Sequence, residues 1–277
     1  MGKLGSRELT AASDLDLILL YDFDPARPES RGRRPLHATQ YFTRLTQRLV
    51  SLLTAPTRNG RLYEVDLRLR PSGGKGPLAT QIAGFAAYQR EEAETWEHMA
   101  LTRARVIAGP PALAARAEAV ISGTLRLARD PRRTRRDITE MRALIAREKG
   151  DDDAADLKLV AGGLIDVEFI AQFLVLRHAH GHPGILRTST RDVFEAARAL
   201  SLLSQGDADQ ATGAHRLLAD VIQMTQLVFG GAPGAALPAE AARRVAVCVG
   251  LPDARSLAAA LADCRANVRE IFTRLIG

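Results

Sequence analysis

Cysteine and long apolar runs are the scarcest features of this sequence. Its two cysteines, Cys248 and Cys264, are too few for a disulfide scaffold and fall in helical patterns, so we expect small buried apolar residues in a reducing cytoplasm. No run approaches the roughly 18 consecutive apolar residues that a membrane span requires. The first residues lead directly into polar sequence, without a signal peptide. The sequence therefore predicts a cytoplasmic protein that does not associate with membranes.

The composition is that of an ordinary globular chain. It has 277 residues, 46% hydrophobic and 25% charged, enough apolar material for one large or two small domains. The formal net charge is +6, and nearly all basic residues are arginine. Such a surplus is compatible with nucleic acid, acidic partners, phosphate-bearing ligands or a solvated arginine-rich surface. Charge alone does not decide among these.

The expected secondary structure changes near residue 110, from mixed strands and helices to helices almost exclusively. Before it, we expect buried strands at residues 15–21 and 61–70, exposed loops at 25–35 and 71–77, and a last strand at 103–107. Helices are expected at 37–53, from about residue 81, and through Trp96. The first of these helices carries one apolar face, formed by Tyr41, Leu45, Leu49 and Leu52.

Almost everything after Gly109-Pro110-Pro111 has a helical pattern. The expected helices cover about 112–127, 134–148, 164–180, 190–203, 207–229, 238–249 and 253–275. Asp253 and Thr190 are candidate N-caps. Residues 156–160 could form a hairpin arm and 230–234 a loop. The predicted fold class is α+β: a small α/β domain at residues 1–109 followed by an all-α helical bundle at 110–277.

Two carboxylates mark the first expected strand. Asp14 and Asp16 project to the same side of an extended backbone, and Leu15 and Leu17 anchor the strand in a core. Asp66 lies on the polar face of the second strand. If the two strands are neighbours, the three carboxylates meet, and such a cluster repels itself unless cations lie between its members. Mg²⁺, which takes hard oxygen ligands and substrate phosphates, fits this pattern.

Further residues in these segments suit a phosphate ligand. A turn at Gly5-Ser6 would let backbone N–H groups approach phosphate oxygens. Arg68 and Arg70 would add positive charge in a fork geometry. A purely structural interpretation is also open: Asp14 caps a turn, Asp16 lies at a strand edge and Asp66 pairs with an arginine. Together the features favour nucleotidyl transfer from a nucleoside triphosphate.

Four blocks resemble the glutamine synthetase adenylyltransferase family. They read GKLGSRELTAASDLDLILLYD from residue 2, LYEVDLRLRPSG from 62, YQREEAETWEHMALTRARV from 88 and GGLIDVEF from 162. They stand in family order and cover roughly residues 2–180. The family's enzymes have two homologous halves, one attaching AMP to a tyrosine of glutamine synthetase and the other removing it by phosphorolysis. The residues Tyr63-Glu-Val-Asp66 and Trp96-Glu-His98 are more similar to the C-terminal, attaching half.

The resemblance implies a polymerase-β-like nucleotidyltransferase domain and assigns roles by matching position. Asp14 and Asp16 match paired metal ligands, Asp66 the third carboxylate, and Gly5 and Ser6 the nucleotide-cradling turn. The family more often has Gly-Gly at that turn. It also has an apolar strand just before Gly2, which this sequence lacks, so we expect a fragment of a longer enzyme.

The implied activity is Mg²⁺-dependent transfer of AMP from ATP to glutamine synthetase, with control by PII-type nitrogen signalling proteins and no nucleic-acid partner. Three rival hypotheses stay open. One is phosphorolytic removal of AMP from adenylylated glutamine synthetase. The second is nucleotidyl transfer to RNA or a small molecule. The third is a truncated, inactive regulatory or interaction module.

A few residues have two interpretations each. Trp96 is expected as a core aromatic, with nucleotide stacking as the second possibility. Glu97 and His98 are expected in structural hydrogen bonds. Arg103 and Arg105 either reach phosphate or pair with nearby glutamates. Asp166 and Glu168, within the last family block, are expected at an interdomain contact or as helix-start charges, with a direct role at the nucleotide as the lesser alternative.

Overall fold

The computed structural model describes residues 1–11, 13–229 and 237–277. Contacts divide the chain into two compact units, Met1–Leu125 and Arg126–Gly277. The first contains short parallel strands and helices, and the described part of the second contains helices and turns only. This is the predicted combination of a small mixed unit and a helical unit. The predicted boundary lies at residue 110, whereas contacts group the next helix with the first unit, because that helix packs on two earlier ones.

The first unit is built around two short parallel strand pairs. Strand β1 (Leu15–Asp16) pairs with β3 (Val65–Asp66), and β2 (Leu19–Tyr21) pairs with β4 (Ala79–Gln81). The predicted strand at 15–21 is therefore interrupted at Leu17–Ile18. The predicted strand at 61–70 is shorter than expected, because only Val65–Asp66 finds a partner in the described sheet.

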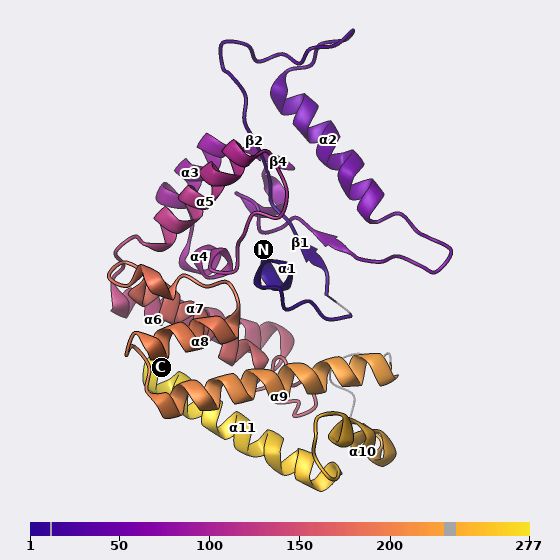
Figure 1. Ribbon diagram of the computed structural model, residues 1–277, viewed down its shortest axis with the longest axis vertical. Helices are drawn as coiled ribbons and strands as arrows, with labels where there is room; N and C mark the ends of the chain where they lie inside the picture. The colour runs from indigo at the N-terminus through magenta and orange to yellow at the C-terminus, as the bar shows by residue number, and fades with distance from the viewer. Residues whose placement is uncertain (12, 230–236) are drawn as a thin grey trace. The chain divides into compact units, whose positions relative to one another are not determined.

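Helices complete the described part of this unit (Figure 1). They are α1 (Gly2–Ser6), α2 (Ala38–Leu53), the 3₁₀ turn η1 (Gly73–Lys75), α3 (Ile82–Glu91), α4 (Thr95–Leu101) and α5 (Pro111–Leu125). Helix α2 packs on β4, and α5 packs on α3 and α4. Tyr21, Ala38 and Ala79 form a small buried cluster, and the Phe42 ring stacks on Tyr21 with centroids 4.4 Å apart. These contacts hold β2 and β4 against α2.

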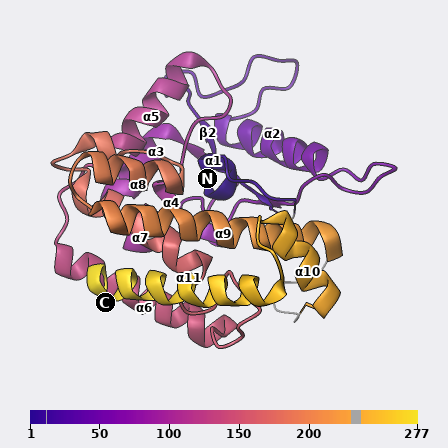
Figure 2. The same cartoon turned by 60° about the horizontal axis from the view of Figure 1, so that its bottom comes forward.

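The second unit surrounds one buried helix. Helix α7 (Leu164–His178) is apolar on nearly every side and contacts α6 (Pro131–Lys149), α8 (Thr190–Ala199), α9 (Gln205–Phe229) and α11 (Ala254–Leu275). A helix that is hydrophobic all round belongs at the centre of a bundle. The 3₁₀ turn η2 (Pro183–Ile185) and α10 (Ala239–Cys248) complete the described part of the unit. Figure 2 shows α9 and α11 lying side by side.

Helix starts follow the capping chemistry of the sequence. The Asp253 side chain accepts the Ser256 backbone N–H at 2.7 Å, which confirms the predicted cap of α11. For α8 the predicted cap was one residue too late. Ser189 occupies the N-cap, and Thr190 is the first helical residue.

Three other local predictions were wrong. Residues 103–107 form no strand, because no described strand pairs with them, and the Arg103 and Arg105 side chains bind α1 and its C-terminal flank. Residues 156–160 form turns, in which the Asp156 carboxylate accepts the backbone N–H groups of Lys158 and Leu159. Cys248 is exposed and Cys264 only partly buried, because Cys248 lies on an outer face of α10. The predicted loop at 230–234 lies outside the described residues.

Candidate active site

The acidic cluster lies where β1 and β3 run side by side. The parallel register places Asp16 opposite Asp66, and the Leu17 N–H donates to the Asp66 carbonyl at 2.9 Å. One carboxylate oxygen from each of Asp14, Asp16 and Asp66 lies within 4.8 Å of the others. The gathering of these residues, predicted from spacing, is confirmed. In the described part of the chain, no other group of three or more such ligands comes together.

The two inner carboxylates have opposite electrostatic environments. Burial raises the pKa of Asp16, and the nearby charge of Asp14 raises it further. Asp66 has a lowered pKa, chiefly because the Arg68 side chain donates hydrogen bonds to it. Carboxylates this close together can all be ionised only when a cation lies beside them. Arg68 supplies one, and a divalent ion held by the three oxygens would supply another. The donor set therefore fits Mg²⁺.

Arg68 is bound to Asp66 through two guanidinium nitrogens. Its Nε lies 2.8 Å and its Nη2 2.5 Å from Oδ2 of Asp66. The arginine side chain is 81% exposed, whereas that of Asp66 is 13% exposed. The guanidinium can therefore leave the carboxylate for an incoming anion without breaking a packed core. This freedom suits the phosphate role predicted for Arg68.

Arg70 has a different set of partners. It is buried, and its guanidinium donates to the carbonyls of Leu67, Gly74, Gly76 and Pro77. These bonds fix the loop at 71–77, which contains η1. Phosphate binding by Arg70, which the sequence suggested, would require these four carbonyls to lose their donor.

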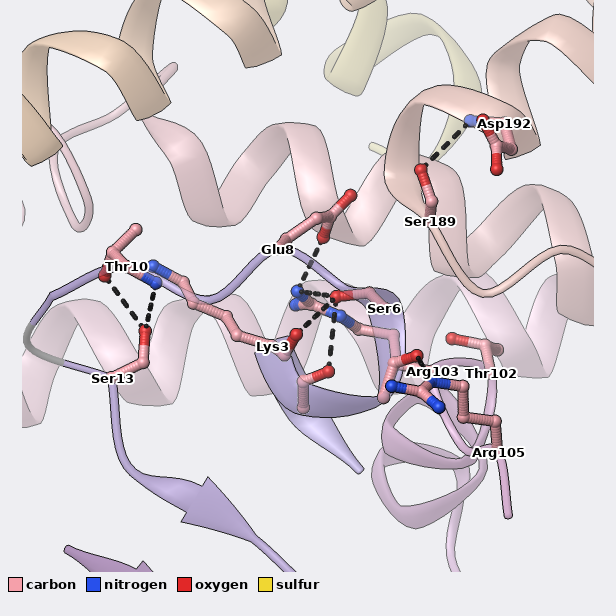
Figure 3. A network of polar contacts seen from close by, with 12 residues as sticks. Lys3, Ser6, Glu8, Thr10, Ser13, Thr102, Arg103, Arg105, Ser189 and Asp192 are labelled. Atoms are coloured by element: carbon pink, nitrogen blue, oxygen red, sulfur yellow. Dashed lines mark hydrogen bonds and ion pairs between the residues drawn. The ribbon is translucent and has the colours of Figure 1, made fainter. Parts of the chain in front are cut away.

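Gly5 and Ser6 lie in a short helix, where the sequence predicted an open turn. A Cβ on Gly5 would come within 1.8 Å of the Arg103 carbonyl oxygen, so only glycine allows this backbone contact. The buried Ser6 hydroxyl donates to backbone carbonyls of α1 and accepts from Arg103 Nη2 at 2.9 Å (Figure 3). The helix ends at Arg7, which adopts the left-handed conformation.

Two arginine side chains hold α1 in place through hydrogen bonds. The sequence did not indicate that both act on this helix. Arg103 donates to Ser6 and to Oε2 of Glu8, and Arg105 donates to the Gly5 carbonyl at 2.9 Å. Figure 3 shows both side chains reaching α1 and its C-terminal flank. The contact between this segment and α1 is indicated by the close approach of the Arg103 backbone carbonyl to Gly5. Of the two interpretations of Arg103, pairing with a glutamate is the one that its contact with Glu8 matches.

The α3–α4 corner contains the hydrogen bonds expected for Glu97 and His98. Tyr88 donates to Oε1 of Glu97 at 2.7 Å, and a ring nitrogen of His98 lies 2.9 Å from the Gln89 carbonyl. The core interpretation of Trp96 was wrong. This residue is exposed, because it lies on the outer side of α4 with its indole N–H directed to Glu94.

An apolar cavity of about 170 Å³ lies beside Asp16. Leu17, Ile18 and Leu20 line one side, and segment 104–110 with α5 lines the other. Sequence reasoning missed it, because its walls come from segments about ninety residues apart.

Asp166 has a structural position in the second unit. It is fully buried in the first turn of α7, accepts Arg142 Nε at 2.5 Å and accepts the Gly162 backbone N–H at 2.7 Å. This agrees with the helix-start charge expected from the sequence.

Comparisons with known proteins match both units. Residues 1–120 match the family model of glutamate-ammonia ligase adenylyltransferase, and residues 136–276 that of GlnD PII-uridylyltransferase. Over its whole length the chain is similar to proteins of the glutamine synthetase adenylyltransferase family. Members of this family are enzymes of the nucleotidyltransferase class, as the sequence resemblance implied.

The matching relatives are named bifunctional glutamine synthetase adenylyltransferase/adenylyl-removing enzymes. Identity is 50% to the protein of Rhodopseudomonas palustris, 53% to that of Xanthobacter autotrophicus and 48% to that of a Bradyrhizobium species, in each case over the whole chain. The chain spans 28% of the length of these relatives. Among the described residues, no helix is long and apolar enough to cross a membrane.

Proposed function

We propose that this chain catalyses Mg²⁺-dependent transfer of AMP from ATP to a tyrosine hydroxyl of glutamine synthetase. One observation carries the proposal: three carboxylates from paired strands converge in a chain whose relatives are named for adenylyl transfer. A bound Mg²⁺ would neutralise phosphate charge and activate the α-phosphorus. Asp14, Asp16 and Asp66 would hold it.

The chain's own residues would position the reactants. Arg68 turns from Asp66 to the triphosphate, where its fork geometry suits phosphate oxygens. Asp66, released from Arg68, orients the tyrosine hydroxyl and helps to draw off its proton. The phenolic oxygen forms a bond to the α-phosphorus in line, the bond to the bridging oxygen breaks, and pyrophosphate leaves. No covalent enzyme intermediate is required.

The test compares Asp14→Asn with the parent in an assay of AMP transfer to unmodified glutamine synthetase. We expect a loss of about 100-fold or more, because one ligand of the metal becomes neutral. Glu118→Gln, an exposed carboxylate on α5 of the same unit, is the control and keeps the parent rate. Equal rates for the parent and Asp14→Asn would remove Asp14 from the mechanism.

Phosphorolytic removal of AMP is the second candidate, because the relatives' names include an adenylyl-removing activity. That reaction would use phosphate as the nucleophile and release ADP. Removal of AMP from adenylylated glutamine synthetase in phosphate, without transfer from ATP, would replace the first proposal with this one. AMP appearing on RNA would favour nucleotidyl transfer to RNA. No change in the melting temperature with Mg·ATP would favour an inactive interaction module.

The proposal extends to regulation and cellular location. The match of residues 136–276 to a PII-uridylyltransferase model supports a PII-type signalling protein as a regulatory partner in nitrogen assimilation. We propose a cytoplasmic enzyme without a nucleic-acid partner.

A further inference from the structure

The basic charge of the chain is concentrated in one segment. Residues 25–62 contain eight arginines and one glutamate, a net charge of +7, whereas the whole chain carries +6. The rest of the chain therefore sums to −1. All eight arginines are exposed. The surplus is thus a local property of this segment and not a general consequence of an arginine-rich composition.

Most of these arginines have no carboxylate beside them. Arg27 pairs with Asp24, and Arg61 lies 3.6 Å from Glu64. Within the described residues, no ion pair involves the other six, which are Arg31, Arg33, Arg34, Arg44, Arg48 and Arg58. A cluster of exposed, unneutralised cations raises the local concentration of acidic partners and accelerates their association.

An apolar stripe lies within this basic segment, on α2. Its members are exposed by 43% (Tyr41), 48% (Leu45), 38% (Leu49) and 75% (Leu52). Their spacing of four, four and three places them on one helix face, beside the buried face that carries Ala38 and Thr46. Arg44 and Arg48 border the stripe on its outer side. An apolar centre with an arginine rim is the usual anatomy of a protein–protein interface.

The same segment leads directly to the acidic cluster. Helix α2 ends at Leu53, and the following loop enters β3, which carries Asp66 (Figure 1). Leu62, in this loop, is 74% exposed. The stripe, the arginines and the acidic cluster all belong to the compact unit Met1–Leu125. A macromolecule bound along residues 25–62 would therefore be held by the part of the chain that carries the carboxylates.

We propose that residues 25–62, here called the arginine surface, dock the acceptor protein. This inference rests on the proposed function and identifies what the site recognises: an acidic region of glutamine synthetase with an apolar centre, near its acceptor tyrosine. A nucleic acid is less well matched, because aliphatic leucines cannot stack on bases. A membrane surface is less well matched, because Tyr41 is the stripe's single aromatic anchor.

The test reverses charge on α2 in the full chain. The variant Arg44→Glu/Arg48→Glu is compared with Arg132→Glu/Arg187→Glu, which makes the same change in charge at exposed positions of the second unit. The dissociation constant for unmodified glutamine synthetase is measured without nucleotide at several salt concentrations. We expect the α2 variant to bind about tenfold or more weakly with a flatter salt dependence, and the control to match the parent. Both variants should bind Mg·ATP as the parent does.

A second variant tests the apolar centre without changing charge. Leu45→Ser/Leu49→Ser should weaken binding of glutamine synthetase and leave the salt dependence as in the parent. Unchanged binding in both α2 variants overturns the proposal. So does failure of the parent to bind, or loss only of binding to RNA or to phosphatidylserine vesicles.

The two proposals fail in different ways. If the parent binds glutamine synthetase but transfers no AMP, the proposed function fails and the docking surface stands. If the parent transfers AMP and charge reversal leaves the KM for glutamine synthetase unchanged, the docking surface fails alone. Equal melting temperatures for the variants and parent show that folding is intact.

Discussion

At the scale of single residues, the carboxylate of Asp16 lowers the stability of the metal-free fold. Because its pKa is raised in the folded protein, the native state holds its proton more tightly than the unfolded chain does. Stability therefore falls as pH rises through that raised pKa, and at neutral pH the ionised carboxylate destabilises the metal-free fold. A divalent cation would reverse this effect by neutralising the charge.

The first prediction concerns Asp16→Asn. Without metal at neutral pH, we expect this variant to be more stable than the parent by roughly 0.5–1 kcal/mol, about 2–4 °C in melting temperature, because a partly buried charge is removed. The same variant should lose the rise in melting temperature caused by Mg·ATP. Thermal unfolding with and without Mg·ATP measures both effects. A variant less stable than the parent in metal-free buffer would contradict the argument.

The second prediction concerns pH. A protonated carboxyl is a poor metal ligand, so Mg²⁺ affinity should weaken as pH falls through the raised pKa of Asp16. Asp66 should still be ionised there, because Arg68 lowers its pKa. Calorimetric titration of Mg²⁺ at a series of acidic pH values checks this. In Asp16→Asn the weak remaining affinity should lose that pH dependence, and an unchanged profile would assign it to another group.

At the scale of secondary structure, α1 is held by a contact that only glycine permits. Gly5→Ala places a methyl group against the Arg103 carbonyl, so we expect a loss of roughly 1–3 kcal/mol in unfolding free energy and lower AMP transfer. Gly84→Ala is the matched control. It lies exposed in α3 with open space at its Cβ and should gain up to about 1 kcal/mol from helix propensity. Urea unfolding measures both, and equal effects would refute the packing argument.

Sequence patterns identified helices better than strands. The helix at α2 and those from α5 onward were predicted, because their apolar periodicity and caps are local. The strands were overestimated, because the pairing that defines them depends on distant segments. At the site, spacing predicted the meeting of Asp14, Asp16 and Asp66. It could not show that Arg70 fastens a loop, because that depends on where four carbonyls point.

At the scale of the whole molecule, the two units have separate cores and separate charge distributions. The Met1–Leu125 unit carries the acidic cluster and the arginine surface. The Arg126–Gly277 unit encloses α7 and the buried pair Arg142–Asp166. Such a pair stabilises little by itself, but removing one partner leaves the other charged and buried. Substituting one partner of this pair in the isolated second unit therefore tests whether that unit folds through its own contacts.

The last prediction concerns that unit expressed alone. Residues 126–277 should be helical and unfold cooperatively, because the described contacts of α7 with α6, α8, α9 and α11 all lie within them. Asp166→Ala should lower the free energy of unfolding by about 3–5 kcal/mol, because it leaves the buried Arg142 charge and the Gly162 N–H without their acceptor. Glu140→Ala, an exposed position on α6, is the control and should change stability little. Circular dichroism with urea measures each. If the isolated segment lacks a cooperative transition, the fold of these helices depends on residues before 126.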